Sequence, residues 1–156
     1  FGRQGIIGPP LESMGITLPF TTIAVVFAQL FVASPFYIRA ARLGFQSVAK
    51  DYEDVSQTLG VSPWWTFWRL TLPLAMPSLA TGIALAWARA LAEFGATLMF
   101  AGNLTGTTQT MPLAIMTAME TSLDAALALS VLLVAGSVFL LAVLGLATRR
   151  QWQGRL

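Results

Sequence analysis

Three long apolar stretches alternate with more polar segments along the chain. They cover Gly15–Ile38, Pro73–Ala101 and Ala125–Thr148, and the only charged residues within them are Arg89 and Glu93. A helix needs about 20 predominantly apolar residues to cross the hydrocarbon core of a bilayer. The pattern therefore predicts an all-α membrane protein with about three transmembrane helices.

The composition agrees with this prediction. Hydrophobic residues make up 56% of the chain and charged residues 10%, with a mean hydropathy of +0.71, whereas a soluble domain carries about 25% charged residues. The formal charge of +2 is not gathered in a basic patch, so no nucleic-acid partner is expected. Cysteine and histidine are absent, which excludes thiol chemistry and the commonest zinc ligands. We expect this chain to bind no cofactor or metal.

The positive-inside rule predicts the orientation of the helices. One side of the membrane carries Arg39, Arg42, Lys50, Arg69, Arg149, Arg150 and Arg155, and the other carries only Arg3. The central segment and the C-terminus are therefore expected in the cytoplasm. Residues 1–17 and 102–122 are expected outside, the latter with a short helix over Met111–Met119. Because the chain begins with Phe1 and not Met, we expect residues 1–156 to be a single transmembrane domain from the C-terminal part of a longer subunit.

The central segment, residues 44–72, predicts two short helices joined by a tight turn. Apolar residues recur at steps of three and four, which places them on one helix face; they are Phe45, Val48, Tyr52, Val55 and Leu59. This face fits packing within the chain as well as docking of a partner. Gly60 suits the end of the first helix, and Ser62 suits the N-cap of the second, with Pro63 at its first position.

Three tryptophans follow in the second of these helices. Trp64, Trp65 and Trp68 are typical of the interface between membrane and water, where an amphipathic ring is stable. Arg69 can extend its charge from the same place into water. We therefore expect this helix to contact membrane lipid.

Two charged residues interrupt the second apolar stretch one helical turn apart. Arg89 and Glu93 fall past the membrane midplane, where a charge costs about 2.5–3.5 kcal/mol. We expect them to pair, and the pair either lines the translocation path or clamps helix packing. Asn103 and Thr107 follow in a Gly- and Thr-rich segment. Their amide and hydroxyl groups suit an oxyanion path, although such residues are equally typical of turns.

The central segment resembles the cytoplasmic signature of ABC importer permease subunits. In that signature Glu-Ala-Ala is followed after three residues by Gly, and after nine more by Ile-x-Leu-Pro. Here Asp54-Val55-Ser56, Gly60 and Leu70-Thr71-Leu72-Pro73 stand at those positions. The spacing matches at every step. The residue types differ, because Asp replaces Glu, Val and Ser replace the two Ala, and Leu replaces Ile.

A second resemblance narrows the type of permease. The run Ala88–Met99, the Ala-Gly-Asn at 101–103 and the run Thr110–Ile115 look like the molybdate permease subunit. Sulfate permeases look similar through the Arg-Ala-x-x-Glu-Phe-Gly part of the first run. Molybdate is therefore the expected substrate, and tungstate or sulfate is the alternative.

The resemblance implies a type I ABC importer permease fold in the cytoplasmic membrane of a bacterium or archaeon. A second permease subunit, as in a homodimer, would complete the translocation path, and an external binding protein would deliver the oxyanion. Two ATP-binding cassette subunits would hold ATP and Mg and bind the cytoplasmic coupling loop at 44–72. The residues implied in that contact are Asp54, Val55, Ser56, Gly60, Val61, Ser62 and Pro63.

The chain contains no Gly-x-x-x-x-Gly-Lys-Ser/Thr sequence, which is the phosphate-binding loop of many ATPases. We therefore expect ATP hydrolysis on a separate subunit and no enzyme activity in this chain. A secondary transporter or channel fragment is the alternative from another class, with Arg89 and Glu93 as its candidate coupling groups. A membrane-embedded enzyme is poorly supported, because Glu93 is the only acidic residue within the predicted spans.

Overall fold

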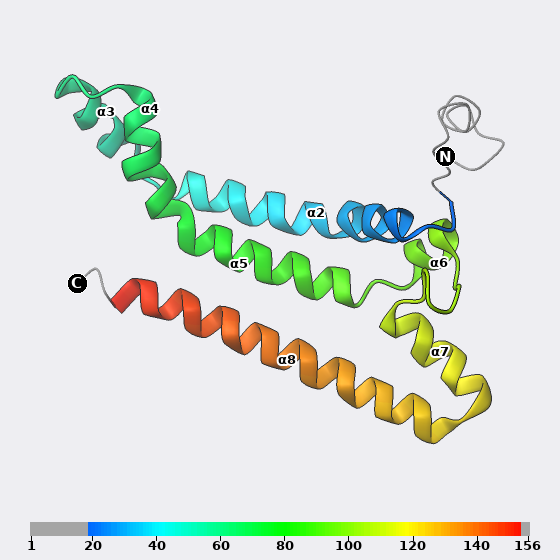
Figure 1. The fold of residues 1–156 in the computed structure, drawn as a ribbon. Helices are drawn as coiled ribbons and strands as arrows, with labels where there is room; N and C mark the ends of the chain where they lie inside the picture. The colour runs from blue at the N-terminus through cyan, green and yellow to red at the C-terminus, as the bar shows by residue number, and fades with distance from the viewer. Residues whose placement is uncertain (1–18, 154–156) are drawn as a thin grey trace, which may run out of the picture. The chain divides into compact units, whose positions relative to one another are not determined.

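The computed structural model describes residues 19–153, with side chains as far as Leu146. This part of the chain is helical and contains no strand. In chain order the helices are α2 (Thr22–Gln46), α3 (Lys50–Thr58), α4 (Pro63–Thr66), the π-helix η1 (Phe67–Thr71), α5 (Leu72–Leu91), α6 (Gly95–Ala101), α7 (Met111–Thr121) and α8 (Leu123–Gln153) (Figure 1).

Three helical runs are long and apolar enough to cross a membrane. They are Thr22–Gln46, the continuous run Pro63–Leu91 through α4, η1 and α5, and Leu123–Leu146. Their lengths of 25, 29 and 24 residues exceed the 20 or so that a bilayer requires. The all-α membrane fold with about three spans is therefore confirmed, and α7 lies where the short helix after the second span is predicted.

The chain forms two compact units. The first combines the residues up to Ala33 with Ala88–Phe139, and the second combines Ser34–Trp87 with the residues from Leu140 onward. Each long helix thus contributes to both units. The assignment of residues 1–156 to one transmembrane domain stays a prediction, and the expected outer loop at 1–17 lies outside the described residues.

The first unit has a small apolar core at the start of α2. This core consists of Ala24, Val25 and Ala101, with Phe100 packed against it. Gly102 follows α6 with a φ of +74°, and a Cβ built on it would lie only 2.8 Å from the ring of Phe20. The hydroxyl of Thr22 donates a hydrogen bond to the carbonyl of Thr107 at 3.2 Å. These contacts fix the turn after α6 against the first residues of α2.

In the second unit, α2 and α5 approach each other closely at two glycines. A Cβ built on Gly82 would lie 2.8 Å from that of Ala40, and one built on Gly44 would lie 2.6 Å from that of Ser78. Small residues permit such close contact between membrane helices. The ring of Phe45 at the end of α2 also stacks on Phe67 of η1, with 6.1 Å between ring centroids.

The second apolar stretch is not one continuous helix, so the predicted span over Pro73–Ala101 is wrong at its end. Helix α5 stops at Leu91, and α6 begins as a separate helix at Gly95. The carboxylate of Glu93 accepts a hydrogen bond from the N–H of Ala96 at 2.7 Å. An N–H in the first turn of a helix has no backbone acceptor, so Glu93 supplies the acceptor that permits a new helix to start here.

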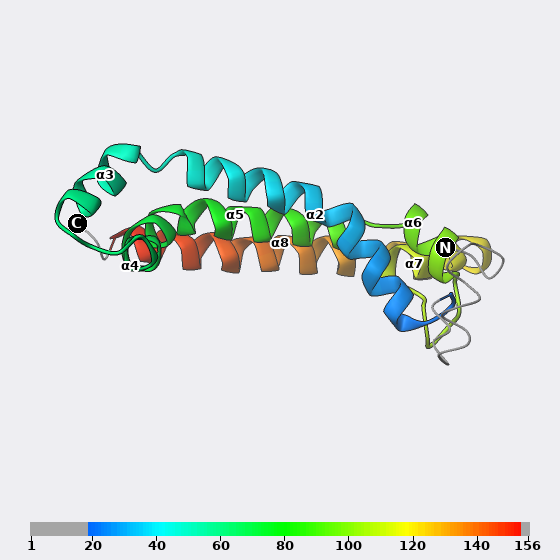
Figure 2. The same ribbon diagram turned by 90° about the horizontal axis from the view of Figure 1, so that it is seen from above.

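The central segment contains the two predicted short helices, joined by a turn. Helix α2 runs through Pro35 to Gln46, and α3 then begins at Lys50. Figure 2 shows α3 and α4 connected by this turn beyond the end of α5. The prediction that Phe45, Val48, Tyr52, Val55 and Leu59 share one helix face is therefore wrong. Phe45 belongs to α2 and Val48 lies in the link between the helices, so only Tyr52, Val55 and the C-cap Leu59 lie along α3.

Candidate functional site

The turn between α3 and α4 has the backbone geometry that the sequence predicts. Gly60 has a φ of +76° and follows Leu59, the C-cap of α3. The N–H of Gly60 donates to the carbonyl of Gln57, and that of Val61 donates to the carbonyl of Ser56. These two bonds form a Schellman motif, which satisfies the last carbonyls of a helix.

The start of α4 is capped as predicted. The hydroxyl of Ser62 accepts a hydrogen bond from the N–H of Trp65 at 3.4 Å, and Pro63 occupies the first turn. A proline here loses no hydrogen bond because the first N–H groups of a helix have no partner within it. Gly60, Ser62 and Pro63 thus define a turn of fixed geometry.

One face of α3 is not covered by the described part of the chain. Tyr52, Val55 and Leu59 are 56%, 57% and 76% exposed, and Asp54 on the same helix is exposed as well. Helix α3 buries none of its residues. Among the described residues, the apolar face therefore has no packing partner within the chain.

Ser56 borders this face and is half-buried on α3. Its hydroxyl is 2.5 Å from that of Thr66 in α4, and Glu53, one turn earlier, accepts a hydrogen bond from the hydroxyl of Thr71 at 2.8 Å. No role for Glu53, Thr66 or the Thr71 side chain was predicted from the sequence. The i, i+3 spacing of Glu53 and Ser56 was the available signal, because it places both on one face.

The three tryptophans of the central segment are exposed around α4 and η1. The rings of Trp64 and Trp68 meet edge to face at 5.7 Å, and the guanidinium of Arg69 lies 5.2 Å above the ring of Trp65. These residues lie at the start of the run Pro63–Leu91 that is long enough to span a membrane. Their contact with membrane lipid stays a prediction.

Arg89 and Glu93 form the predicted ion pair. Arg89 Nη1 lies 2.8 Å from Glu93 Oε2, and their side chains are 35% and 4% exposed. The other oxygen of Glu93 accepts the hydrogen bond from Ala96. Glu93 is therefore buried and bonded through both oxygens, whereas part of the Arg89 guanidinium remains accessible.

Asn103 and Thr107 lie in the turn after α6, in the same unit as this pair. Asn103 Nδ2 donates to the hydroxyl of Thr117 in α7 at 2.9 Å, while its Oδ1 is buried without a hydrogen-bond partner. Thr107 is exposed, and its carbonyl binds Thr22. Among the described contacts, none joins Asn103 or Thr107 to Arg89 or Glu93.

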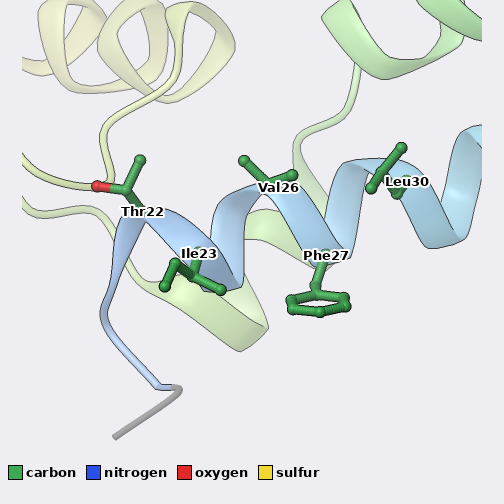
Figure 3. A pocket seen from close by; sticks show the side chains of 5 residues that line it. All are labelled: Thr22, Ile23, Val26, Phe27 and Leu30. Atoms are coloured by element: carbon green, nitrogen blue, oxygen red, sulfur yellow. The ribbon is translucent and has the colours of Figure 1, made fainter. Parts of the chain in front are cut away.

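A shallow apolar groove of about 200 Å³ lies along the start of α2. Figure 3 shows that the five side chains lining it all come from one stretch of this helix; they are Thr22, Ile23, Val26, Phe27 and Leu30. The only polar group is the hydroxyl of Thr22, which is bonded to Thr107. The groove therefore offers no charge to an anion. Within residues 19–153, no cluster of acidic side chains could hold a metal ion.

Comparison with known proteins identifies the family. The family model described as "Binding-protein-dependent transport system inner membrane component" matches residues 6–153. The chain belongs to this family. The resemblance to ABC importer permeases is thus confirmed, and the three apolar helices make this permease an integral membrane protein. Permease subunits of ABC transporters are not themselves catalytic.

Three relatives show the range of names in the family. The molybdenum transport system permease protein of Mycobacterium tuberculosis is 48% identical over 149 residues, which are 96% of this chain and 56% of that protein. The protein of the same name in Escherichia coli K12 is 40% identical over 121 residues, 77% of this chain and 53% of that protein. The sulfate transport system permease protein of Synechococcus elongatus is 42% identical over 113 residues, which are 72% of this chain and 40% of that protein. The permease chain thus spans about half the length of the curated relatives it matches.

Proposed function

We propose that this permease chain belongs to the membrane subunit of an ATP-driven importer that carries molybdate across the cytoplasmic membrane. The observation that carries the proposal is the uncovered apolar face of α3, which ends in a turn of fixed geometry. An uncovered face of this kind, in a protein of a transport family, fits the docking of a soluble partner.

The partners follow from the family and from the absence of a phosphate-binding loop in this sequence. Two ATP-binding cassette subunits bind ATP and Mg, and each contacts the central segment of one permease subunit. A second copy of the permease completes the path, and an external protein delivers the oxyanion. The basic residues at the end of α2 (Arg39 and Arg42), in the central segment (Lys50 and Arg69) and near the C-terminus support a cytoplasmic position for the central segment and the C-terminus.

In this mechanism the ATPase subunits move the central segment when they close on ATP. Tyr52, Val55 and Leu59 supply the apolar contact, and Asp54 supplies an exposed charge on the same helix. Movement of this surface shifts α5, because α4 and η1 continue into α5 without interruption. The path then changes between inward-facing and outward-facing states.

We assign a clamping role to the Arg89–Glu93 pair. Glu93 is buried with both oxygens bonded, which leaves it little capacity to bind a passing anion. Arg89 is about one-third exposed, so its free donors, with Asn103 and Thr107, are the groups that can meet an oxyanion. Glu93 thus stabilises the break between α5 and α6, while Arg89 faces the translocation path.

Molybdate is preferred over sulfate because a relative named for molybdenum is 48% identical over 96% of this chain, whereas one named for sulfate matches 72% of it. The test is uptake of labelled molybdate by the full-length subunit with its ATPase in vesicles. We expect excess unlabelled molybdate and tungstate to abolish uptake and equal sulfate to leave most of it. Equal inhibition by all three anions would contradict the assignment.

A further inference from the structure

Two side-chain hydrogen bonds connect α3 to the helix that leads into the membrane. The hydroxyl of Thr71 in η1 donates to Glu53 Oε1 at 2.8 Å. The hydroxyls of Ser56 and Thr66 lie 2.5 Å apart. Both bonds run between residues that are separated by the turn at Gly60, so they hold α3 alongside the segment formed by α4 and η1.

The π-helix places both threonines where α3 can reach them. Glu53 and Ser56 are three residues apart and therefore share a face of α3. Thr66 and Thr71 are five residues apart, a spacing that an α-helix would turn to different sides. A π-helix closes its backbone bonds between residues five apart, and η1 covers Phe67–Thr71. The wider turn of the π-helix thus brings Thr66 and Thr71 to one side of the segment, where Ser56 and Glu53 on one face of α3 bind them.

The two bonds differ in whether their loss would leave the threonine hydroxyl without a hydrogen-bond partner. Thr66 is 4% exposed, and its hydroxyl also donates to the carbonyl of Ser62, so it keeps a partner without Ser56. Thr71 is 7% exposed, and its hydroxyl donates to Glu53. A hydrogen bond to a carboxylate is about twice as strong as one between neutral groups. Glu53 is therefore the residue on which the connection mainly depends.

The rest of the second unit is already well connected. Phe67 of η1 stacks on Phe45 of α2, and α2 contacts α5 closely at Gly44 and Gly82. Helix α3 is joined to this assembly in sequence by residues 47–49, which follow α2, and by the short turn Leu59–Ser62, which precedes α4. Nothing lies within 4 Å of the Cβ position of Gly60, so the turn keeps its own backbone hydrogen bonds but does not pack against the rest of the unit at this point.

We propose that Glu53 is a positioning residue that makes α3 move as one body with η1 and α5. The inference rests on the proposed function, because it concerns how force on α3 reaches the membrane. A partner subunit contacts the outer face of α3, and Glu53 acts on the opposite side through Thr71. Without this bond, movement of α3 is absorbed in its connections at residues 47–49 and Leu59–Ser62, and α5 does not follow.

The test compares Glu53→Ala with Glu53→Gln in the full-length subunit assembled with its ATPase in vesicles. The quantity measured is the number of ATP molecules hydrolysed per molybdate taken up. Glu53→Ala should raise this ratio about tenfold. Losing one hydrogen bond to a charged group shifts the equilibrium between α3 held against η1 and α3 released from it by about this factor. Glu53→Gln should stay much closer to the original ratio than Glu53→Ala, since its amide oxygen still accepts from Thr71, although more weakly than the carboxylate. Thr71→Val should behave as Glu53→Ala, and the double variant should be no worse than either single one.

A matched control is Thr58→Val, because Thr58 is exposed on α3 and its hydroxyl bonds only to the carbonyl of Val55 in the same helix. This control makes the same Thr→Val change as Thr71→Val but leaves the bond between Glu53 and Thr71 in place. It should therefore leave the ratio of ATP hydrolysed to molybdate taken up unchanged. A normal ratio in Glu53→Ala would overturn the proposal. So would equal losses in Glu53→Ala and Glu53→Gln, because these would point to the charge and not to the bond.

A second measurement separates this inference from the proposed function. Spin labels at Asp51→Cys on α3 and Leu74→Cys on α5 report the distance between the two helices in the permease without its ATPase. These residues are exposed, and the 156 residues contain no other cysteine. Glu53→Ala should broaden the distance distribution, and Glu53→Gln should not. An unchanged distance distribution in Glu53→Ala overturns the proposal for Glu53. A lack of ATP-driven uptake by the unmodified complex refutes the proposed function but not the bond between Glu53 and Thr71.

Discussion

Gly60 shows how one backbone conformation determines the shape of the central segment. Its φ of +76° lies in the left-handed region, and nothing lies within 4 Å of its Cβ position. A residue with a side chain would therefore be strained here by its backbone conformation and not by contact with neighbouring atoms. Helix ends use glycine for this reason, and asparagine is the residue that tolerates the conformation next best.

We predict that Gly60→Val destabilises the turn by about 1–2 kcal/mol, the cost of a left-handed conformation for an ordinary residue. Gly60→Asn should cost much less, although it adds a side chain of similar size. Thermal unfolding of the purified subunit measures the difference, and coupling of ATP hydrolysis to uptake should fall in the valine variant only. Equal effects of the two substitutions would mean that side-chain size, and not conformation, matters at this position.

The ion pair of Arg89 and Glu93 is the second feature at the residue scale. Each charge is the partner of the other at 2.8 Å, and Glu93 also holds the N–H of Ala96. Removal of Arg89 leaves a buried carboxylate with one bond fewer, and such losses cost about 1–3 kcal/mol. The pairing was predicted from a spacing of four residues, but the bond to Ala96 was not, because it depends on where α5 ends.

We predict that Arg89→Ala and Glu93→Ala are not additive. The double variant should be less destabilised than the sum of the single ones, with an interaction energy of about 0.5–3 kcal/mol. Glu93→Ala should be the more harmful single change, because it also removes the acceptor for α6. The measurement is unfolding of the four variants in detergent under identical conditions, and simple additivity would refute an energetic pairing.

At the scale of elements, α2 and α5 depend on close contact between small residues. The Cβ that a substitution would add at Gly82 lies 2.8 Å from that of Ala40 and 3.2 Å from the ring of Tyr37. Distances below 3.0 Å do not occur between real atoms of this kind, so one helix must shift. Gly136 on α8 provides the contrast, since nothing lies within 4 Å of its Cβ position.

We predict that Gly82→Leu destabilises the subunit by about 1–3 kcal/mol, the usual cost of overpacking. Gly136→Leu should be close to neutral in the same detergent assay, because its side chain points into open space within this chain. A loss of stability at Gly136 equal to that at Gly82 would show that another helix covers α8 in the assembled protein. No loss at Gly82 would contradict the close approach of α2 and α5.

Sequence reasoning located most elements but not every boundary. The apolar runs predicted α2, α5 and α8. The turn chemistry predicted the end of α3 at Gly60 and the start of α4 at Ser62 and Pro63. The end of α5 at Leu91 was missed, since Ala92–Ala101 reads as a continuation of the apolar run. The hydrogen bonds of Glu53 and Ser56 were also missed, because the π-helix that places Thr66 and Thr71 has no recognised sequence signal.

At the scale of the molecule, the described part of the permease exposes most of the apolar surface of its long helices. Leu132, Val134 and Phe139 on α8 are each more than 60% exposed. Membrane lipid or further helices cover such surface in a bilayer. The face of α3 differs from these, because the same helix carries the exposed charge of Asp54 and the segment is expected outside the hydrocarbon core. Its exposure therefore fits a soluble partner.

The most direct test of this account is uptake of labelled molybdate into vesicles that contain the full-length permease subunit, measured with and without its ATP-binding cassette subunits. We predict that uptake requires both these subunits and ATP, and that the permease alone moves no more molybdate than protein-free vesicles. Uptake at the full rate without the ATPase subunits would contradict the account, because α3 would then have no role as the site where force is applied.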